Sequence, residues 1–331
     1  MPELQIMIFT VIGLALLFDF INGFHDTANA IATSVSTRAL HPSHAIIMAA
    51  VLNFAGAMYS TGVAKTIGAD IVKSAQHVDE HIIIAALIGA VLWNILTWWL
   101  ALPSSSSHAL VGGIIGAVLV SVGLDGLNFY GIGKIVLSLI LSPLIAIVTG
   151  CCVMTLLFQV FGRFSPSAVN GKFKKMQVLS AAMMAFSHGS NDAQKSMGII
   201  TLALLAGGYI EVFEVPTFVK LLAATAMACG TAVGGWRIIK TIGGKIFKLE
   251  PISGFAADLN SSFVIFSATL LHLPVSTTHV VSGSIMGVGT AKRLSAVRWG
   301  VAQQMVAAWV MTIPSTAIIG ALAYKVIRMF I

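Results

Sequence analysis

The chain has 331 residues, of which 57% are hydrophobic and only 9% are charged. Apolar runs long enough to cross a bilayer recur along its whole length, which excludes a soluble fold and predicts an all-α polytopic membrane protein. These runs do not alternate with period two, so a β-barrel is not expected. We attribute the net charge of +7 to Lys and Arg residues that set orientation in the membrane, and we expect no nucleic-acid partner.

The first half begins with an apolar run at 4–37 that is interrupted between Asn22 and Asn29. At about 1.5 Å per residue this run is too long for one straight crossing, so we predict one discontinuous span. A second span is expected at 44–62, followed by a mixed loop at 63–80. The run at 82–122 is interrupted by Leu102-Pro103-Ser104-Ser105-Ser106-Ser107-His108, and a long span containing Pro143 follows at 134–161.

The second half repeats this order. A run at 176–206 is broken around Asp192, a span at 217–236 follows, and the run at 255–290 is interrupted by Leu273-Pro274-Val275-Ser276-Thr277-Thr278-His279. The last span, 299–330, contains Pro314. Three landmarks match between the halves, at spacings of 166, 171 and 171 residues: Asp26 with Asp192, Pro103 with Pro274, and Pro143 with Pro314. Their common order indicates an internal duplication.

Loop charge predicts the orientation of the two halves. The segments 38–44, 162–175, 237–250 and 291–298 hold 12 of the 19 Lys and Arg residues, which is typical of cytoplasmic loops. The first repeat (1–161) and the second (176–331) are then inverted relative to each other and joined by a basic cytoplasmic linker at 162–175. Both termini are expected outside. Inverted repeats with discontinuous helices and hairpins that meet near the bilayer midplane are typical of secondary transporters.

Two hydroxyl clusters precede apolar helical runs, and this pattern predicts an anion site. Ser and Thr are good N-caps, and the free N–H groups and positive dipole end of a helix attract anions. The predicted anion ligands are Ser105, Ser106, Ser107, Ser276, Thr277 and Thr278. Two such N-termini converging from opposite sides would replace the hydration shell of a tetrahedral oxyanion. The alternative, in which these hydroxyls only bond the preceding turn or a neighbouring helix, is disfavoured because the clusters are duplicated.

Buried carboxylates predict a cation beside this anion. Ionised Asp26 and Asp192 would repel an anion, so they must bind a cation or carry a proton while substrate is bound. Asn22, Asn29 and Asn191 offer neutral ligands beside them. Lys195 either contacts the anion or simply pairs with Asp192. For Asp19 and Asp258, structural pairing and ion handling both stay open. No cofactor is expected, and the three cysteines have no metal-ligand spacing, so no metal centre is predicted.

At these residues a family resemblance becomes clear. The motifs Asn22-Gly23-Phe24-His25-Asp26-Thr27-Ala28-Asn29-Ala30, His188-Gly189-Ser190-Asn191-Asp192 and the two proline-led clusters resemble the paired signatures of the PiT family of inorganic phosphate transporters. The resemblance implies symport of inorganic phosphate with a cation, two inverted repeats and frequently a homodimer. The family's first motif usually has Asn where this chain has His25. The His version resembles the bacterial low-affinity branch, which implies proton rather than sodium coupling, acceptance of metal–phosphate complexes, and a place in the cell membrane.

Three alternatives accompany this hypothesis. Some members of the family carry sulfate, so another tetrahedral oxyanion is an alternative substrate. A passive anion channel would use the same hydroxyl clusters but would not need two buried aspartates. An intramembrane serine hydrolase would need one asymmetric nucleophile–base pair, whereas these clusters are duplicated. We therefore expect a transporter and not an enzyme.

Overall fold

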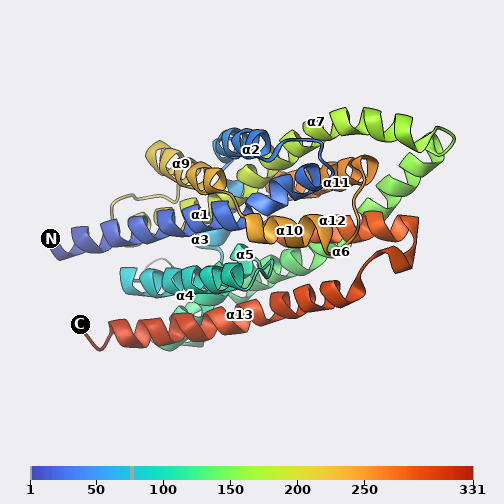
Figure 1. Ribbon diagram of the computed structural model, residues 1–331. Coiled ribbons are helices and arrows are strands. Elements are labelled where there is room, and N and C mark those ends of the chain that lie inside the picture. The colour runs from blue at the N-terminus through green and yellow to red at the C-terminus, as the bar shows by residue number, and fades with distance from the viewer. Residues whose placement is uncertain (1, 75–77, 331) are drawn as a thin grey trace.

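The computed structural model describes residues 2–74 and 78–330, and these fold into thirteen α-helices (Figure 1). The first half contains α1 (Pro2–Ser36), α2 (Pro42–Ala57), α3 (Gly62–Ala69), α4 (Glu80–Trp99), α5 (Ser106–Ser121) and α6 (Phe129–Phe161). The second half contains α7 (Pro166–Asp192), α8 (Gln194–Ala206), α9 (Thr217–Val233), α10 (Trp236–Gly244), α11 (Pro251–Leu270), α12 (Thr277–Lys292) and α13 (Trp299–Ile327).

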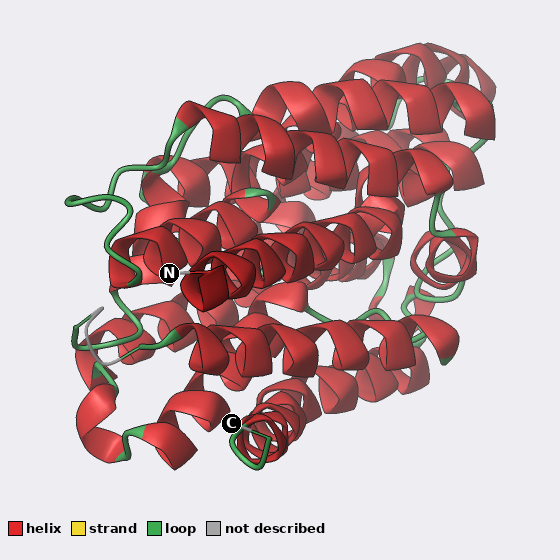
Figure 2. Cartoon of the chain, turned by 90° about the vertical axis from the view of Figure 1, so that its left-hand side faces the viewer, coloured by secondary structure: helices red, strands yellow, loops and turns green. Residues whose placement is uncertain are grey.

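The helices form one elongated bundle. Both termini lie at the same end, and the turn between α6 and α7 lies at the other (Figure 1). Figure 2 views the bundle from the end that holds the termini and shows helices packed throughout, with loops at the margins. By length and composition, four helices of the described residues could each cross a membrane, or up to six if each bent pair is one span. This architecture confirms the predicted all-helical polytopic membrane fold.

Apolar side chains on the outside of the bundle mark its lipid-facing surface. Helix α6 shows this most simply, because it exposes a broad apolar face to the surroundings: Leu137, Ile140, Leu141, Leu144, Ile145 and Val148. Polar side chains are instead gathered inside, where Asp, Asn, Ser and Thr residues from several helices are fully buried. The fold therefore has an apolar exterior and many buried polar groups inside, and polar groups at membrane depth are usually functional.

The predicted break in the first span is wrong. Helix α1 runs without interruption from Pro2 to Ser36, through the whole Asn22–Asn29 motif. Asn22, Asp26 and Asn29 recur at helical spacing of four and three residues, and all three are at most 1% exposed. Each finds partners on other helices, so the backbone has no need to unwind. The matching break in the second half is confirmed: α7 ends at Asp192 and α8 begins at Gln194.

Three segments predicted as loops are partly helical. Helix α3 occupies the start of the predicted 63–80 loop, whose residues 75–77 lie outside the described residues. Helix α10 occupies much of 237–250, and α7 begins at Pro166, inside the predicted 162–175 linker. This part of α7 has one buried and one exposed side, since Phe173 and Gln177 are buried while Lys172, Lys174 and Lys175 are exposed. Its charges therefore lie on the outer face of a helix.

Both predicted hairpins are present, and they pack in equivalent ways. Helix α5 packs on α13, and α12 packs on α6. Glycines allow the close approach in both places. A Cβ on Gly116 would lie 1.9 Å from the Ala317 carbonyl oxygen, and a Cβ on Gly287 would lie 2.1 Å from that of Ile147. A second set of helices shows the same reciprocal packing: α1 of the first half packs on α9 of the second half, and α7 of the second half packs on α2 of the first. Each half thus completes the packing of the other.

Candidate anion and cation site

Two helix N-termini with the same cap face each other at the centre of the bundle. The Ser105 side chain accepts a hydrogen bond from the His108 backbone N–H at 3.2 Å, and the Ser276 side chain accepts one from that of His279 at 3.3 Å. The two following histidine rings lie with their centroids 4.6 Å apart. Ser107 of one hairpin donates to the Val275 carbonyl of the other at 2.8 Å. The positive ends of α5 and α12 therefore converge as the duplicated motifs predicted.

The six predicted hydroxyls divide into two groups. Ser105 and Ser276 cap their own helices, and Ser107 ties the two hairpins together. The hydroxyls of Ser106, Thr277 and Thr278 instead reach the charged centre. Ser106 accepts from the Lys195 ammonium at 3.0 Å, and the two threonines donate to carboxylates.

Asp26 receives its partners from both halves of the chain. The Nδ1 atom of His25 lies 2.9 Å from Asp26 Oδ1, and Thr278 donates to the same oxygen at 3.2 Å. Asn29, one turn along α1, donates to Thr278 at 2.9 Å. The carboxylate of the first half is thus joined directly to a predicted anion-site hydroxyl of the second half.

Asp192 lies among more donors than Asp26 does. The Lys195 ammonium approaches its Oδ1 at 2.8 Å, while Oδ2 accepts from Thr277 at 3.2 Å and from Asn22 at 3.4 Å. Lys195 is completely buried and bridges Asp192 and Ser106. The ion pair that was one of the two alternatives for Lys195 is therefore present, and its contact with an anion stays a prediction; the hydrogen bond to Ser106 gives the buried ammonium a second partner.

His188, to which the sequence assigned no role, also faces Asp192. Its Nε2 lies 3.6 Å from Asp192 Oδ2, and its Nδ1 lies 3.0 Å from the Asn53 side-chain oxygen. The orientation of the Asn53 amide follows from its contact with Thr231. The Thr231 hydroxyl donates its hydrogen to the Met227 carbonyl, so it can only accept a hydrogen bond from Asn53, and the atom of Asn53 that faces it must be the amide nitrogen. Nδ1 of His188 therefore carries a hydrogen, and Nε2 faces the carboxylate.

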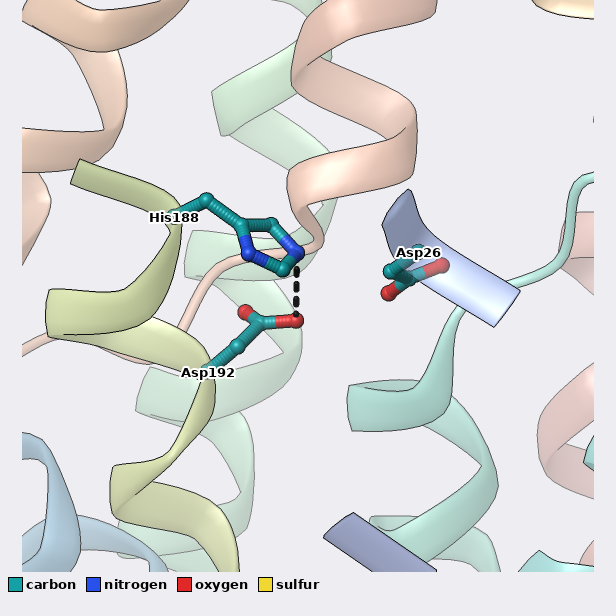
Figure 3. Close-up of side chains that lie close together, drawn as sticks. All are labelled: Asp26, His188 and Asp192. Atoms are coloured by element: carbon teal, nitrogen blue, oxygen red, sulfur yellow. Dashed lines mark ion pairs between the residues drawn. The ribbon is translucent and has the colours of Figure 1, made fainter. Parts of the chain in front are cut away.

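This arrangement brings three ligand groups together: Asp26, His188 and Asp192 offer atoms that all lie within 4.8 Å of one another (Figure 3). Figure 3 shows the His188 ring beside Asp192, with Asp26 approaching from α1 on the other side. Two carboxylates and an imidazole nitrogen in a buried space repel one another unless a cation lies between them or a proton joins them. The group can hold a metal ion, and the hydrogen bond from His188 to Asn53 is the support that ligating histidines usually have. No metal centre was predicted from the sequence, where only the cysteine spacing was considered; this group joins Asp26 of α1 to two residues far along the chain.

One predicted cation ligand has a different position. The Asn191 amide nitrogen donates to Thr269 at 3.0 Å and its oxygen accepts from the Val275 backbone at 3.3 Å, so this side chain holds the α11–α12 hairpin. Of the other predicted residues, Asn22 donates to Asp192, the His25 ring contacts Asp26, and Asn29 donates to Thr278, which bonds Asp26. No contact tests the roles predicted for these residues, and those roles stay predictions.

Two more buried carboxylates lie beyond this centre. Asp19 accepts a hydrogen bond from Ser196, and Asp258 accepts one from Thr33 at 2.5 Å. Asp19 and Thr33 are seven residues before and after Asp26. With Asn22 and Asn29 they complete a buried polar stripe along α1 that joins all these sites.

Comparison with known proteins agrees with this geometry. The model of the phosphate transporter family matches the chain twice, at residues 22–168 and 163–320. A probable low-affinity inorganic phosphate transporter of Bacillus subtilis is 50% identical over 99% of both chains, and one of Rhizobium meliloti is 46% identical over 95% of this chain and 94% of its own. A solved structure described as "the sodium-dependent phosphate transporter" has a TM-score of 0.87 at 26% identity, covering 98% of this chain and 100% of that one. These relatives are transporters rather than enzymes, and the chain belongs to the phosphate transporter family as a multi-pass membrane protein.

Proposed function

We propose that this phosphate transporter imports inorganic phosphate across the bacterial cell membrane by symport with a cation, with a proton favoured over sodium. One observation carries the proposal: Thr277 and Thr278 at the anion-site helix donate directly to Asp192 and Asp26. An anion bound at this N-terminus would lie against two carboxylates, and their charge must be neutralised before it can stay there. A bound cation or proton therefore favours phosphate binding, and phosphate favours the cation.

In this proposal, Ser106, Thr277, Thr278 and Lys195 bind the phosphate oxygens, together with the N–H groups at the starts of α5 and α12. Asp26 and Asp192, assisted by His25, Asn22 and Asn29, hold the coupling cation. Sulfate is the alternative substrate with the same shape. A passive channel is disfavoured, because it would gain nothing from two costly buried carboxylates.

The choice of proton over sodium rests on His25 and His188, two imidazoles that face the two aspartates at 2.9 and 3.6 Å. Imidazole is the side chain that ordinarily exchanges protons near neutral pH. The cluster of Asp26, His188 and Asp192 also supports entry of phosphate as a complex with a divalent metal. Imidazole nitrogen combined with carboxylate oxygen suits such ions.

The two-fold organisation of the site supports the repeat boundaries. We propose that 1–161 and 176–331 are the inverted repeats, that 162–175 is the cytoplasmic linker, and that both termini are external. The reciprocal packing of α5 on α13 and of α12 on α6 supports this division, as does the position of both termini at one end of the bundle (Figure 1). We likewise propose membrane lipid as a partner, from the apolar exterior, and a homodimer, from the family resemblance.

Uptake into proteoliposomes tests the proposal. Purified protein is reconstituted, and labelled phosphate uptake is followed under an inward proton gradient, an inward sodium gradient, or neither. We expect accumulation above the external concentration under the proton gradient, and competition by arsenate but weak competition by sulfate. Uptake that only equilibrates phosphate under every gradient would contradict symport.

A further inference from the structure

Asp19 is a buried carboxyl group that the transport site described above does not use. It lies on α1, two helical turns before Asp26, which is about 10.5 Å along the helix axis, and its exposed fraction is 0%. Ser196 on α8 donates a hydrogen bond to its Oδ2. Among the described residues, its Oδ1 has no hydrogen-bond partner.

Asp19 and its partner Ser196 have apolar core residues close to them in the chain. Ala15 and Phe18 on α1, and Ala193 and Met197 on either side of Ser196, all belong to the buried hydrophobic core. An ionised carboxylate that is held there by one hydroxyl is costly, whereas a neutral carboxylic acid costs far less. Sodium would need several oxygen ligands, and the hydrogen bonds at this position provide one hydroxyl. A proton is the cation that this position suits.

The position of Lys195 connects Asp19 to the substrate. The charged groups that face Asp19 are Lys195 on α8 and Asp192 at the end of α7. The Lys195 ammonium also contacts Ser106 in the anion site at 3.0 Å. Phosphate bound to Ser106 and Lys195 adds negative charge to this region and engages the ammonium, which favours the neutral form of a nearby carboxyl group.

We propose that Asp19 carries a proton of the transport cycle, taking it up when phosphate binds and releasing it when phosphate leaves. Asp19 acts through Lys195 and does not touch the substrate, so it is a coupling residue outside the anion site. The proton is exchanged with water, and the carboxyl group alternates between its neutral and ionised forms. By linkage, phosphate binding strengthens proton binding and proton binding strengthens phosphate binding by the same factor. This inference rests on the proposed function, because it requires phosphate at Ser106 and Lys195.

Calorimetry measures this linkage without any transport. Phosphate is titrated into purified protein in buffers with different ionisation enthalpies, which gives the number of protons taken up for each phosphate bound across a pH series. We expect Asp19→Asn to bind phosphate and to take up about one proton fewer than the natural protein, because one carboxyl group carries one proton. As a control, Asp125→Asn removes an exposed carboxylate and leaves proton uptake unchanged.

A second variant covers the case in which Asp19→Asn does not fold. Ser196→Ala keeps the carboxyl group but removes the hydrogen bond that stabilises its ionised form, so the pH window of proton uptake should move upward. Unchanged proton uptake in Asp19→Asn, or an unmoved window in Ser196→Ala, overturns the role of Asp19. If the natural protein binds no phosphate at all, the proposed function itself is wrong, and the two failures are thereby distinguished.

Discussion

Thr278 Oγ1, at the start of α12, donates a 3.2 Å hydrogen bond to Asp26 Oδ1 on α1. An anion-site hydroxyl of the second half is therefore held by the carboxylate of the first half. In the proposed mechanism, this hydroxyl turns from Asp26 to a phosphate oxygen when phosphate binds, and a cation or proton on Asp26 releases it. This exchange gives one physical reason for anion and cation to be bound together.

Removing the Thr278 hydroxyl should weaken phosphate binding. Thr278→Val keeps the shape of the side chain but leaves a buried oxygen of the anion without its donor, a cost of about 1–3 kcal/mol. The dissociation constant for phosphate should rise about 5- to 150-fold, measured by calorimetry. Thr225→Val on α9 is the matched control, since Thr225 is exposed and bonds only its own helix at Leu221. Equal phosphate affinity in the two variants would mean that Thr278 serves helix packing and does not bind phosphate.

Neutralising both central carboxylates should uncouple transport. In the double variant Asp26→Asn, Asp192→Asn, size and hydrogen-bonding capacity are kept while the charge and the titratable proton are lost. We expect no accumulation of phosphate under an imposed ion gradient, with residual exchange of phosphate for phosphate. Proteoliposome uptake and counterflow measure the two activities. Normal accumulation by a correctly folded double variant would end the proposed coupling mechanism.

The two capped helix starts of the candidate anion site were predictable because their signal is local and duplicated. Ser105 and Ser276 cap helices that begin where the motifs place them, and the cap bonds differ by only 0.1 Å. The course of α1 was not predictable. Polar residues inside an apolar run suggested an unwound segment, yet they all lie on one buried face and are bonded by residues far along the chain. Only tertiary partners such as Thr278 determine whether α1 unwinds at these polar residues or continues as a helix with one polar face.

His188 shows that prediction of the site from the sequence has the same limit. Its spacing of four residues before Asp192 was visible in the sequence, but its role depends on Asn53, 135 residues away. Asn53 in turn is oriented by Thr231. A chain of three hydrogen bonds, two of them between remote segments and one inside α9, determines which imidazole nitrogen faces the carboxylates, and no local pattern encodes it.

Disrupting that chain should weaken metal binding. Asn53→Leu removes the acceptor for the His188 Nδ1 hydrogen while leaving the three ligand groups in place. The loss of such a supporting hydrogen bond typically lowers metal affinity about 10- to 100-fold. Titration of Mn²⁺ in the presence of phosphate measures this effect. Phosphate binding without metal serves as the internal control and should change little. Unaltered Mn²⁺ affinity would argue against a metal ion at Asp26, His188 and Asp192.

The duplicated helix contacts should be sensitive to a single methyl group. Gly116→Ala places a Cβ 1.9 Å from a backbone oxygen of α13, which must move away, and overpacking of this kind costs about 1–3 kcal/mol. We expect a lower unfolding temperature in detergent. Gly171→Ala on α7 is the control, because nothing lies within 4 Å of its Cβ position and alanine favours a helix by about 1 kcal/mol. Equal unfolding temperatures for the two variants would contradict the packing described here.

The last prediction concerns the identity of the coupling ion. The Nδ1 atom of His25 lies 2.9 Å from Oδ1 of Asp26, the carboxylate proposed to hold the coupling ion. Replacing it in His25→Asn removes the exchangeable proton and adds a neutral carbonyl oxygen, which is a sodium ligand. We expect uptake driven by a proton gradient to fall and uptake driven by a sodium gradient to appear, measured in separate proteoliposome experiments. His41→Asn, a histidine at the start of α2 and outside the site, is the control and should keep the natural preference. If His25→Asn retains proton-driven uptake with no response to sodium, His25 does not select the ion, and selection must come from His188 or Asp19.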